Sequence, residues 1–286
     1  MGAQGAEEEG ALDEVLELVA RGATRDLREY ARSSHRARVL GRMSALGLAD
    51  LREYALRLRE DPGELDALAG SLLNHSTGFF RDPAVYRTLE EVVVPALRRR
   101  FDRRHPLRAW SIGCATGEEA WSLGVVLAEV LPPGEPFEVL ATDLDPGSLA
   151  RAREARYTAR ELESAPARLR GRWFVPDSPH REVVTPRPEL RERTVFAIHD
   201  LVGPTLAPPE AVLGSFHLVT CRNLLLYLEP RLREKASGRL ASLLLPGGVL
   251  VLGLGEEQPG QRFRPFPGVD PALRLFERLD ADEAAA

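Results

Sequence analysis

The stretch Leu107–Val130, which reads LRAWSIGCATGEEAWSLGVVLAEV, decides the fold. Its apolar residues alternate into a turn of small residues, and two acids then open a segment whose apolar positions recur at helical spacing. This pattern predicts a strand, a glycine turn and a helix. A second strand, Phe137–Ala141, follows and leads to Asp143. Together these parts are typical of one βαβ unit.

The turn and Asp143 indicate a nucleoside cofactor. Glycines such as Gly113 let the backbone approach a ligand closely, and an acid after the second strand can hold two ribose hydroxyls. A dinucleotide-binding turn leaves the helix N-terminus free for a pyrophosphate, whereas here Glu118 and Glu119 occupy the first helical turn. These carboxylates favour a positively charged ligand such as S-adenosylmethionine. Alternatively, they serve only the helix dipole.

Composition excludes several classes of protein. The chain has 286 residues with 44% hydrophobic content, so it can bury a sizeable core. Its net charge of −5 argues against a nonspecific nucleic-acid binder. Because we find neither a long apolar run nor a signal-peptide pattern, we expect a cytoplasmic protein that is not inserted in a membrane. Cys114 and Cys221 fit neither a metal-ligand cluster nor a disulfide framework, so we expect buried free thiols and no metal.

Hydrophobic periodicity divides the chain into a helical part and a sheet part. The expected parts are a disordered N-terminus at 1–10, a helical domain at 11–75, a linker and helix at 76–105, a sheet domain at 106–280 that would bind the S-adenosylmethionine cofactor and can hold a small β insertion within 157–193, and a disordered tail at 281–286.

Strands separated by helices predict a doubly wound, Rossmann-like α/β sheet that is mostly parallel. The last strand, Leu273–Leu279, is expected to enter antiparallel as an edge. In open α/β sheets, ligands lie beyond the carboxyl ends of the strands. Here those ends carry Asp200, which can accept from an adenine amino group, and Asn223, which can donate and accept. Tyr227 is expected near the same opening.

Two further stretches stand out in the first hundred residues. The stretch Ala31–Leu48 contains no acidic residue. Its basic residues are Arg32, His35, Arg36, Arg38 and Arg42. Such a face can dock an acidic helix of a partner, or it can be an ordinary solvated face. In the second stretch, Phe79 and Phe80 are expected to plug the helical domain onto the sheet domain, while Arg81 can pair with a carboxylate.

On these residues the chain resembles the CheR-type chemotaxis receptor methyltransferases, which esterify glutamate side chains of chemoreceptors with S-adenosylmethionine. The resemblance covers about residues 11 to 280. The matching stretches are TGFFRD at 77–82, WSIGCATGEEAWS at 110–122, ATDLD at 141–145, CRNLLLYLE at 221–229 and LPGGVLVLGLGE at 245–256.

The resemblance implies a set of cofactor-binding positions, with His75 standing where the family often has asparagine. With Gly113 of the glycine turn added, the expected cofactor-binding residues are His75, Thr77, Arg81, Gly113, Glu118, Asp143, Asp200, Leu201, Arg222 and Asn223. It also implies S-adenosylhomocysteine as product and the cytoplasmic helical domain of a chemoreceptor as partner. If the basic face is a docking face, Arg32, Arg36, Arg38 and Arg42 could contact that partner. A monomer is expected.

The chemistry implied is an in-line transfer of a methyl group to a carboxylate. A glutamate side chain, with an unperturbed pKa of about 4.3, is already ionised at neutral pH, so no general base is needed. Catalysis then depends on alignment, which can supply about 7 to 11 kcal/mol. The catalytic candidates are Arg81 or Arg222, to aim the carboxylate, and Tyr227, to shape its approach.

Two alternatives remain open at the level of sequence. The chain could be a non-catalytic scaffold that binds S-adenosylmethionine or its product and docks an acidic helix through the basic helix. It could also be a nicotinamide dehydrogenase, which Glu118 and Glu119 disfavour.

Overall fold

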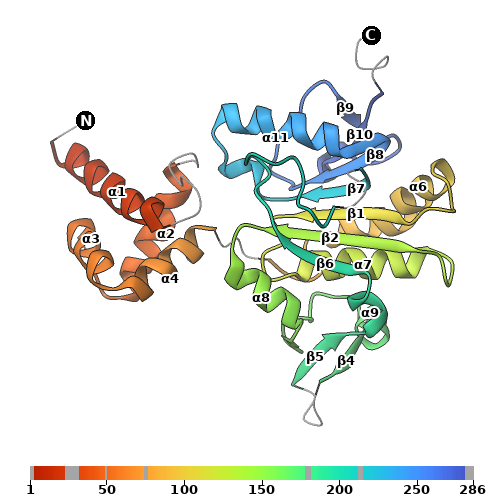
Figure 1. The fold of residues 1–286 in the computed structure, drawn as a ribbon, viewed down its shortest axis with the longest axis horizontal. Coiled ribbons are helices and arrows are strands. Elements are labelled where there is room, and N and C mark those ends of the chain that lie inside the picture. The colour runs from red at the N-terminus through yellow and green to blue at the C-terminus, as the bar shows by residue number, and fades with distance from the viewer. Residues whose placement is uncertain are drawn as a thin grey trace. The chain divides into compact units, whose positions relative to one another are not determined.

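The computed structural model describes residues 3–22, 32–48, 50–73, 77–177, 182–211 and 215–280. Its internal contacts divide the chain into two compact units. The helical unit comprises residues 1–75 with 226–232, and the sheet unit comprises residues 76–225 with 233–286 (Figure 1). No helix in the described ranges is both long and apolar enough to cross a membrane.

The helical unit is built from amphipathic helices, which are α1 (Ala3–Gly22), α2 (Arg32–Ala45), α3 (Leu51–Glu60) and α4 (Pro62–Leu73). α1 packs against α3 and α4, and α2 packs against α4. The side chain of Asp50 caps α3 by accepting a hydrogen bond from the Arg52 N–H at 2.8 Å. We expected residues 1–10 to be disordered, but α1 already begins at Ala3, because alanine, glutamine and glutamate are strong helix formers.

The sheet unit is organised around a mostly parallel sheet. Its strands are β1 (Leu107–Ile112), β2 (Phe137–Asp143), β6 (Thr194–Ile198), β7 (Phe216–Cys221), β8 (Leu244–Leu252), β9 (Phe263–Pro265) and β10 (Leu275–Arg278). In the described residues the strand order is β6-β2-β1-β7-β8-β10-β9. The first five strands of this order are parallel, while β10 runs antiparallel to β8.

The predicted doubly wound sheet with an antiparallel last strand is confirmed, but the last strand is not its edge. β9 pairs antiparallel with β10 and lies outside it. A three-residue strand that ends in Pro265 shows too little periodicity to be recognised from the sequence.

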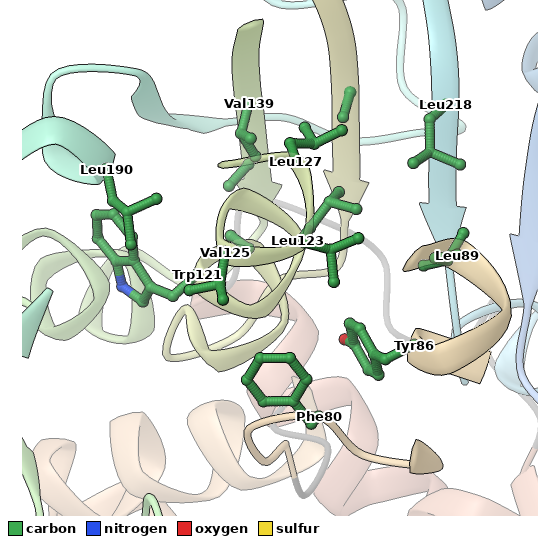
Figure 2. Close-up of a cluster of buried hydrophobic side chains, with 14 of the residues drawn as sticks. Phe80, Tyr86, Leu89, Trp121, Leu123, Val125, Leu127, Val139, Leu190 and Leu218 are labelled. Atoms are coloured by element: carbon green, nitrogen blue, oxygen red, sulfur yellow. The ribbon is translucent and has the colours of Figure 1, made fainter. Parts of the chain in front are cut away.

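The remaining helices precede or separate the strands along the chain, and several of them pack against the sheet to form its core. They are α5 (Pro83–Thr88), which continues through a π-helical turn at Leu89–Val93 into α6 (Val94–Arg100), then α7 (Glu118–Val130), α8 (Pro146–Glu154), α9 (Ala167–Trp173), α10 (Pro188–Arg191), α11 (Pro230–Leu243) and short 3₁₀ turns at Leu225–Tyr227 and Pro271–Leu273. α7 packs against β1 and β2, and α8 packs against β2 and β6. Figure 2 shows Leu127 of α7 beside Val139 of β2, within the same cluster of buried side chains as Leu123 and Leu218. This packing fixes the start of α7 against the ends of the central strands.

A second, smaller sheet interrupts the chain between β2 and β6. It consists of β3 (Tyr157–Thr158), β4 (Phe174–Pro176) and β5 (Val183–Pro186), paired antiparallel in the order β3-β5-β4. These strands lie within the stretch 157–193, where the sequence suggested a β insertion.

Candidate functional site

The candidate ligand positions meet at the carboxyl ends of four neighbouring parallel strands, β6, β2, β1 and β7. The turn Gly113–Gly117 follows β1, Asp143 ends β2, Asp200 follows β6, and Arg222 and Asn223 follow β7. We call this edge of the sheet the rim. Because parallel strands end at the same edge, the strand order itself brings these residues together.

Asp143 ties the glycine turn to the end of β2. Its Oδ2 accepts a hydrogen bond from the backbone N–H of Ala115 at 2.8 Å, and its Oδ1 accepts one from the N–H of Asp145 at 3.0 Å. Burial raises the pKa of this carboxyl, and the backbone N–H groups act in the opposite direction. Since each oxygen of a carboxylate has two lone pairs, Asp143 retains capacity to accept from a sugar hydroxyl.

Glu118 and Glu119, which are adjacent at the start of α7, have different surroundings. The Glu118 carboxylate accepts from the hydroxyl of Thr116, with oxygen–oxygen distances of 2.7 and 2.9 Å, and burial raises its pKa. Glu119 instead accepts from Ser111 Oγ at 2.8 Å and from Thr220 Oγ1 at 2.6 Å. It therefore links β1 to β7, whereas Glu118 stays beside the glycine turn.

The segment Thr77–Asp82 has a strained backbone. Phe80 and Asp82 have positive φ angles of 49° and 59°, which residues other than glycine rarely adopt. Arg81, which lies between them, has an exposed side chain. Ala115 and Asn223, at two other parts of the rim, also have positive φ angles, of 46° and 59°. Strain of this kind persists where the surrounding structure enforces it and is common at ligand sites.

Phe79 and Phe80 pack inside the sheet unit, which corrects the expectation that they plug the helical domain onto it. The Phe79 ring contacts Tyr157 and Phe174 edge-on, with centroids 4.9 and 5.2 Å apart. The Phe80 N–H donates to Ser122 Oγ of α7 at 3.0 Å. The two aromatic residues thus anchor the strained segment to the core, where Figure 2 shows Phe80 beside Tyr86.

Arg222 lies beneath this segment, with only 3% of its side chain exposed. Its guanidinium forms an ion pair with Asp82, donates to the carbonyl oxygen of Arg81 at 3.0 Å, and lies 3.6 Å from Glu119 Oε2. It also lies over the Tyr86 ring, 5.7 Å from the centroid. Its Nε is buried without a hydrogen-bond partner among the described residues. Arg222 therefore holds the backbone of the strained segment in place.

Glu256, which we did not predict as a site residue, fixes the loop after β7. Its Oε2 accepts from the N–H groups of Asn223 at 3.0 Å and Gly253 at 2.6 Å, and its Oε1 accepts from the N–H of Leu225 at 2.7 Å. The side chain is 1% exposed. A Cβ on Gly253 would come within 2.9 Å of the Asn223 nitrogen, so only glycine permits this close approach.

The loop after β6 is held from α11. Asp200 accepts from the N–H of Val202 at 2.9 Å, and Arg239 donates to the carbonyl oxygens of Leu201 and Gly203. We did not predict Arg239 as a site residue. Its partners are backbone carbonyls, which leave no pattern of side chains to recognise.

Several candidate residues are not placed at the rim. His75 lies outside the described residues, as do the side chains of Arg32, Arg36 and Arg38, although the backbone of α2 is described. Tyr227 ends the 3₁₀ turn that follows Asn223 by two residues, and it belongs to the helical unit. The roles of these residues therefore remain proposals.

Arg42, the remaining residue of the expected docking face, is engaged within the helical unit. Its Nε donates to Glu64 Oε1 at 3.0 Å, and the Tyr54 hydroxyl donates to the same oxygen at 2.8 Å. Burial acts to raise the pKa of Glu64, but the hydrogen bonds from Arg42 and Tyr54 outweigh it and lower the pKa. Arg42 thus has a structural partner in Glu64, whereas we had expected it to be available for docking.

Comparison with known proteins identifies the family. Residues 75–267 match the family model described as CheR methyltransferase, SAM binding domain, and residues 10–73 match the one described as CheR methyltransferase, all-alpha domain. The chain belongs to the CheR methyltransferase family. Membership assigns it S-adenosylmethionine (SAM) as cofactor and excludes the dehydrogenase alternative.

Individual relatives agree with this family. The chain is 31% identical to chemotaxis protein methyltransferase 2 of Pseudomonas aeruginosa over 79% of this chain and 77% of the relative. It is 31% identical to the chemotaxis protein methyltransferase of Escherichia coli over 85% of this chain and 82% of the relative. An uncharacterized 104.1 kDa protein of Rhodobacter capsulatus is 31% identical over 96% of this chain, which spans only 28% of that relative.

The residues at the rim fit this cofactor. The buried Glu118 carboxylate stands at the N-terminus of α7, where it would repel a pyrophosphate and attract a cation. The Asp143 carboxylate can still accept hydrogen bonds from ribose hydroxyls. The buried N–H at Nε of Arg222 donates no hydrogen bond within the described residues. Glu118, Asp143 and Arg222 are therefore the residues that would hold a sulfonium nucleoside at the rim.

Proposed function

We propose that this chain transfers the methyl group of SAM to glutamate side-chain carboxylates of chemoreceptor cytoplasmic helices, giving glutamate methyl esters. The observation that supports this most is the excess of acid over base at the rim. Asp82 and Glu119, which are partly exposed, share the guanidinium of Arg222, while Glu118 is buried and Asp143 is partly buried. Such a rim favours a ligand that brings positive charge.

A carboxylate acceptor suits a site of this kind. When bound, SAM supplies a methyl group made electrophilic by the adjacent positive sulfur. A carboxylate oxygen forms the new C–O bond while the C–S bond breaks and its electron pair stays on sulfur, so a cation and an anion give two uncharged centres. The acceptor is already ionised at neutral pH, and no residue has to remove a proton. The protein's task is therefore alignment and exclusion of water.

Arg81 is the arginine that we propose to aim the acceptor carboxylate. Its side chain is exposed, and its backbone is held by the strained residues on both sides and by the hydrogen bond from Arg222. Arg222 is engaged with Asp82 in the interior, so we assign it to positioning rather than to contact with the acceptor. Tyr227 remains the proposed aromatic that shapes the approach of the glutamate.

Docking of the receptor is proposed to use α2. The segment that contains this helix carries Arg32, Arg36 and Arg38 without any acid, and methylation helices rich in glutamate would complement it. Because Arg42 binds Glu64, the other three arginines carry the proposal. Charge reversal of Arg38 to Glu is expected to raise the KM for the receptor severalfold, leaving kcat and the affinity for S-adenosylhomocysteine unchanged.

The test of the function is labelling of receptor cytoplasmic fragments with methyl-labelled SAM. We expect label that alkali releases as methanol, because carboxyl esters are base-labile. A fragment whose accepting glutamates are replaced by glutamine is the matched control and should stay unlabelled. Absence of base-labile label from every receptor fragment, in a preparation that binds S-adenosylhomocysteine, would contradict the proposal and favour a cofactor-binding scaffold.

A further inference from the structure

A tyrosine of the small sheet reaches the glycine turn of the rim. Tyr157 belongs to β3, and its side chain is fully buried. Its hydroxyl donates to the carbonyl oxygen of Thr116 at 2.6 Å and accepts from Trp121 Nε1 of α7 at 2.9 Å. One hydroxyl thus connects the small sheet, the turn after β1 and the first part of α7.

The turn is shaped to receive this hydroxyl. Gly117 has a φ of 95°, and a Cβ at this position would lie 2.9 Å from both the Tyr157 hydroxyl and the Cβ of Ala152. Only glycine therefore lets the tyrosine approach so closely. The residue that accepts its hydrogen bond, Thr116, in turn donates to Glu118.

Tyr157 also contacts the other cofactor segment. The edge-on contact with Phe79 joins it to the TGFFRD stretch, and Ser164, which follows β3, donates to the carbonyl oxygen of Phe79 at 2.6 Å. Burial and the nearby charge of Glu118 raise the pKa of the Tyr157 hydroxyl well above its ordinary value. The hydroxyl consequently stays protonated and remains a donor.

We propose that Tyr157 is a positioning residue for cofactor binding, and that β3 of the small sheet is thereby a working part of the cofactor site. Through its hydrogen bond to Thr116 and its contact with Phe79, it sets the relative placement of the glycine turn and the TGFFRD segment. This inference rests on the proposed cofactor site at the rim.

The test replaces the hydroxyl by hydrogen, as Tyr157→Phe, and measures the affinity for S-adenosylhomocysteine by calorimetry. Loss of the hydroxyl leaves the Thr116 carbonyl and the Trp121 N–H unpaired, and we expect the dissociation constant to rise about tenfold. Tyr54→Phe is the matched control, because Tyr54 is also fully buried and also donates a hydrogen bond, to Glu64 of the helical unit. Both changes should lower the melting temperature, but only Tyr157→Phe should weaken binding. An unchanged dissociation constant for Tyr157→Phe would overturn the inference.

Two further measurements complete the test. Asp143→Ala, measured alongside, separates the two proposals: if it leaves affinity unchanged, the rim site itself is wrong, whereas an effect of Asp143→Ala without one of Tyr157→Phe overturns only the role of the tyrosine. If Tyr157→Phe does not fold, hydrogen exchange on the unaltered chain decides. Added S-adenosylhomocysteine should slow amide exchange in residues 155–163 as well as in the glycine turn, and slowing confined to the turn would contradict the proposal.

Discussion

Each of the two units contains a network of arginine, glutamate and tyrosine side chains, but the two networks differ in their number of acidic side chains per arginine. In the helical unit, Glu64 is satisfied by Arg42 and Tyr54, and its pKa is lowered. At the rim, Arg222 serves two acids, Asp82 and Glu119, and its own Nε has no partner in the described part of the chain.

The difference separates an arrangement that only stabilises from one that can also bind. A carboxylate with a lowered pKa has found its counter-charge within the fold, so it offers little to a ligand. Glu118 and Asp143 have raised pKa values, mainly because of burial, so their ionised forms are under-compensated. A cation that binds at the rim would supply the missing positive charge. Matched substitutions in the two units test whether this difference in charge is real.

The largest effect is expected from Arg222→Met. The change leaves Asp82 and Glu119, which are partly exposed, without the buried cation that they share, and breaking such a pair costs up to about 3 to 5 kcal/mol of unfolding free energy. Arg42→Met is the control. Arg42 is about one-third exposed and Glu64 keeps Tyr54, so a loss of about 1 to 3 kcal/mol is expected. Urea unfolding followed by circular dichroism measures both, and equal losses would contradict the comparison.

Asp143→Ala should come next, with an effect on binding. Loss of a buried, charged hydrogen-bond acceptor is worth about 1 to 3 kcal/mol, so affinity for S-adenosylhomocysteine should fall roughly 10- to 100-fold. Asp145→Ala is the control, because Asp145 caps α8 by accepting from the N–H groups of Gly147 and Ser148. It should cost about 1 kcal/mol of stability without changing affinity. Calorimetry that finds the same affinity in both variants would remove Asp143 from the site.

A smaller effect is expected from Glu256→Gln. An amide cannot accept all of the backbone N–H groups that the carboxylate accepts, so the loop carrying Asn223 should loosen and affinity for S-adenosylhomocysteine should fall about threefold to tenfold. Glu277→Gln provides a control of equal chemistry, since Glu277 is buried in β10 and pairs with Arg100 and Arg264. If both variants lost the same affinity, the effect would be one of general stability.

The smallest effect concerns pH. Because Glu118 and Asp143 have raised pKa values, they protonate before ordinary carboxyls as the pH falls, and a neutral carboxyl no longer attracts a sulfonium. Affinity for SAM should therefore rise with pH through these pKa values, and affinity for S-adenosylhomocysteine should rise less. The sign for folding is opposite, since a raised pKa favours the protonated folded state at low pH. Calorimetry between about pH 5 and pH 8 checks this, and Glu118→Gln should flatten the dependence for SAM. Identical pH profiles for the two ligands would contradict it.

The parts of the fold that local patterns encode could be predicted from the sequence. The βαβ unit around Gly113 and the N-cap at Asp50 follow from periodicity and from short-range hydrogen bonds, and the strand ends place Asp143 and Asp200 on one edge. The family could be recognised for the same reason, because its stretches are contiguous in sequence.

The supporting contacts could not be predicted, because they join distant residues through backbone groups. Glu256 and Arg239 bind N–H and carbonyl groups, and the sequence carries no mark of such partners. Arg42 and Glu64 are 22 residues apart in sequence, so the charge pattern of Ala31–Leu48 did not indicate that Arg42 forms an ion pair within its own unit. The expected role of Arg222 in aiming the acceptor likewise overlooked Asp82, which lies 140 residues away in sequence.

The most direct test of the central claim is a crystal structure of the protein with S-adenosylhomocysteine. We expect the nucleoside at the rim, with its ribose hydroxyls within hydrogen-bond distance of Asp143 and its sulfur facing the segment that carries Arg81. Ligand density elsewhere, or a rim filled by the side chains of Glu118 and its neighbours, would contradict the claim.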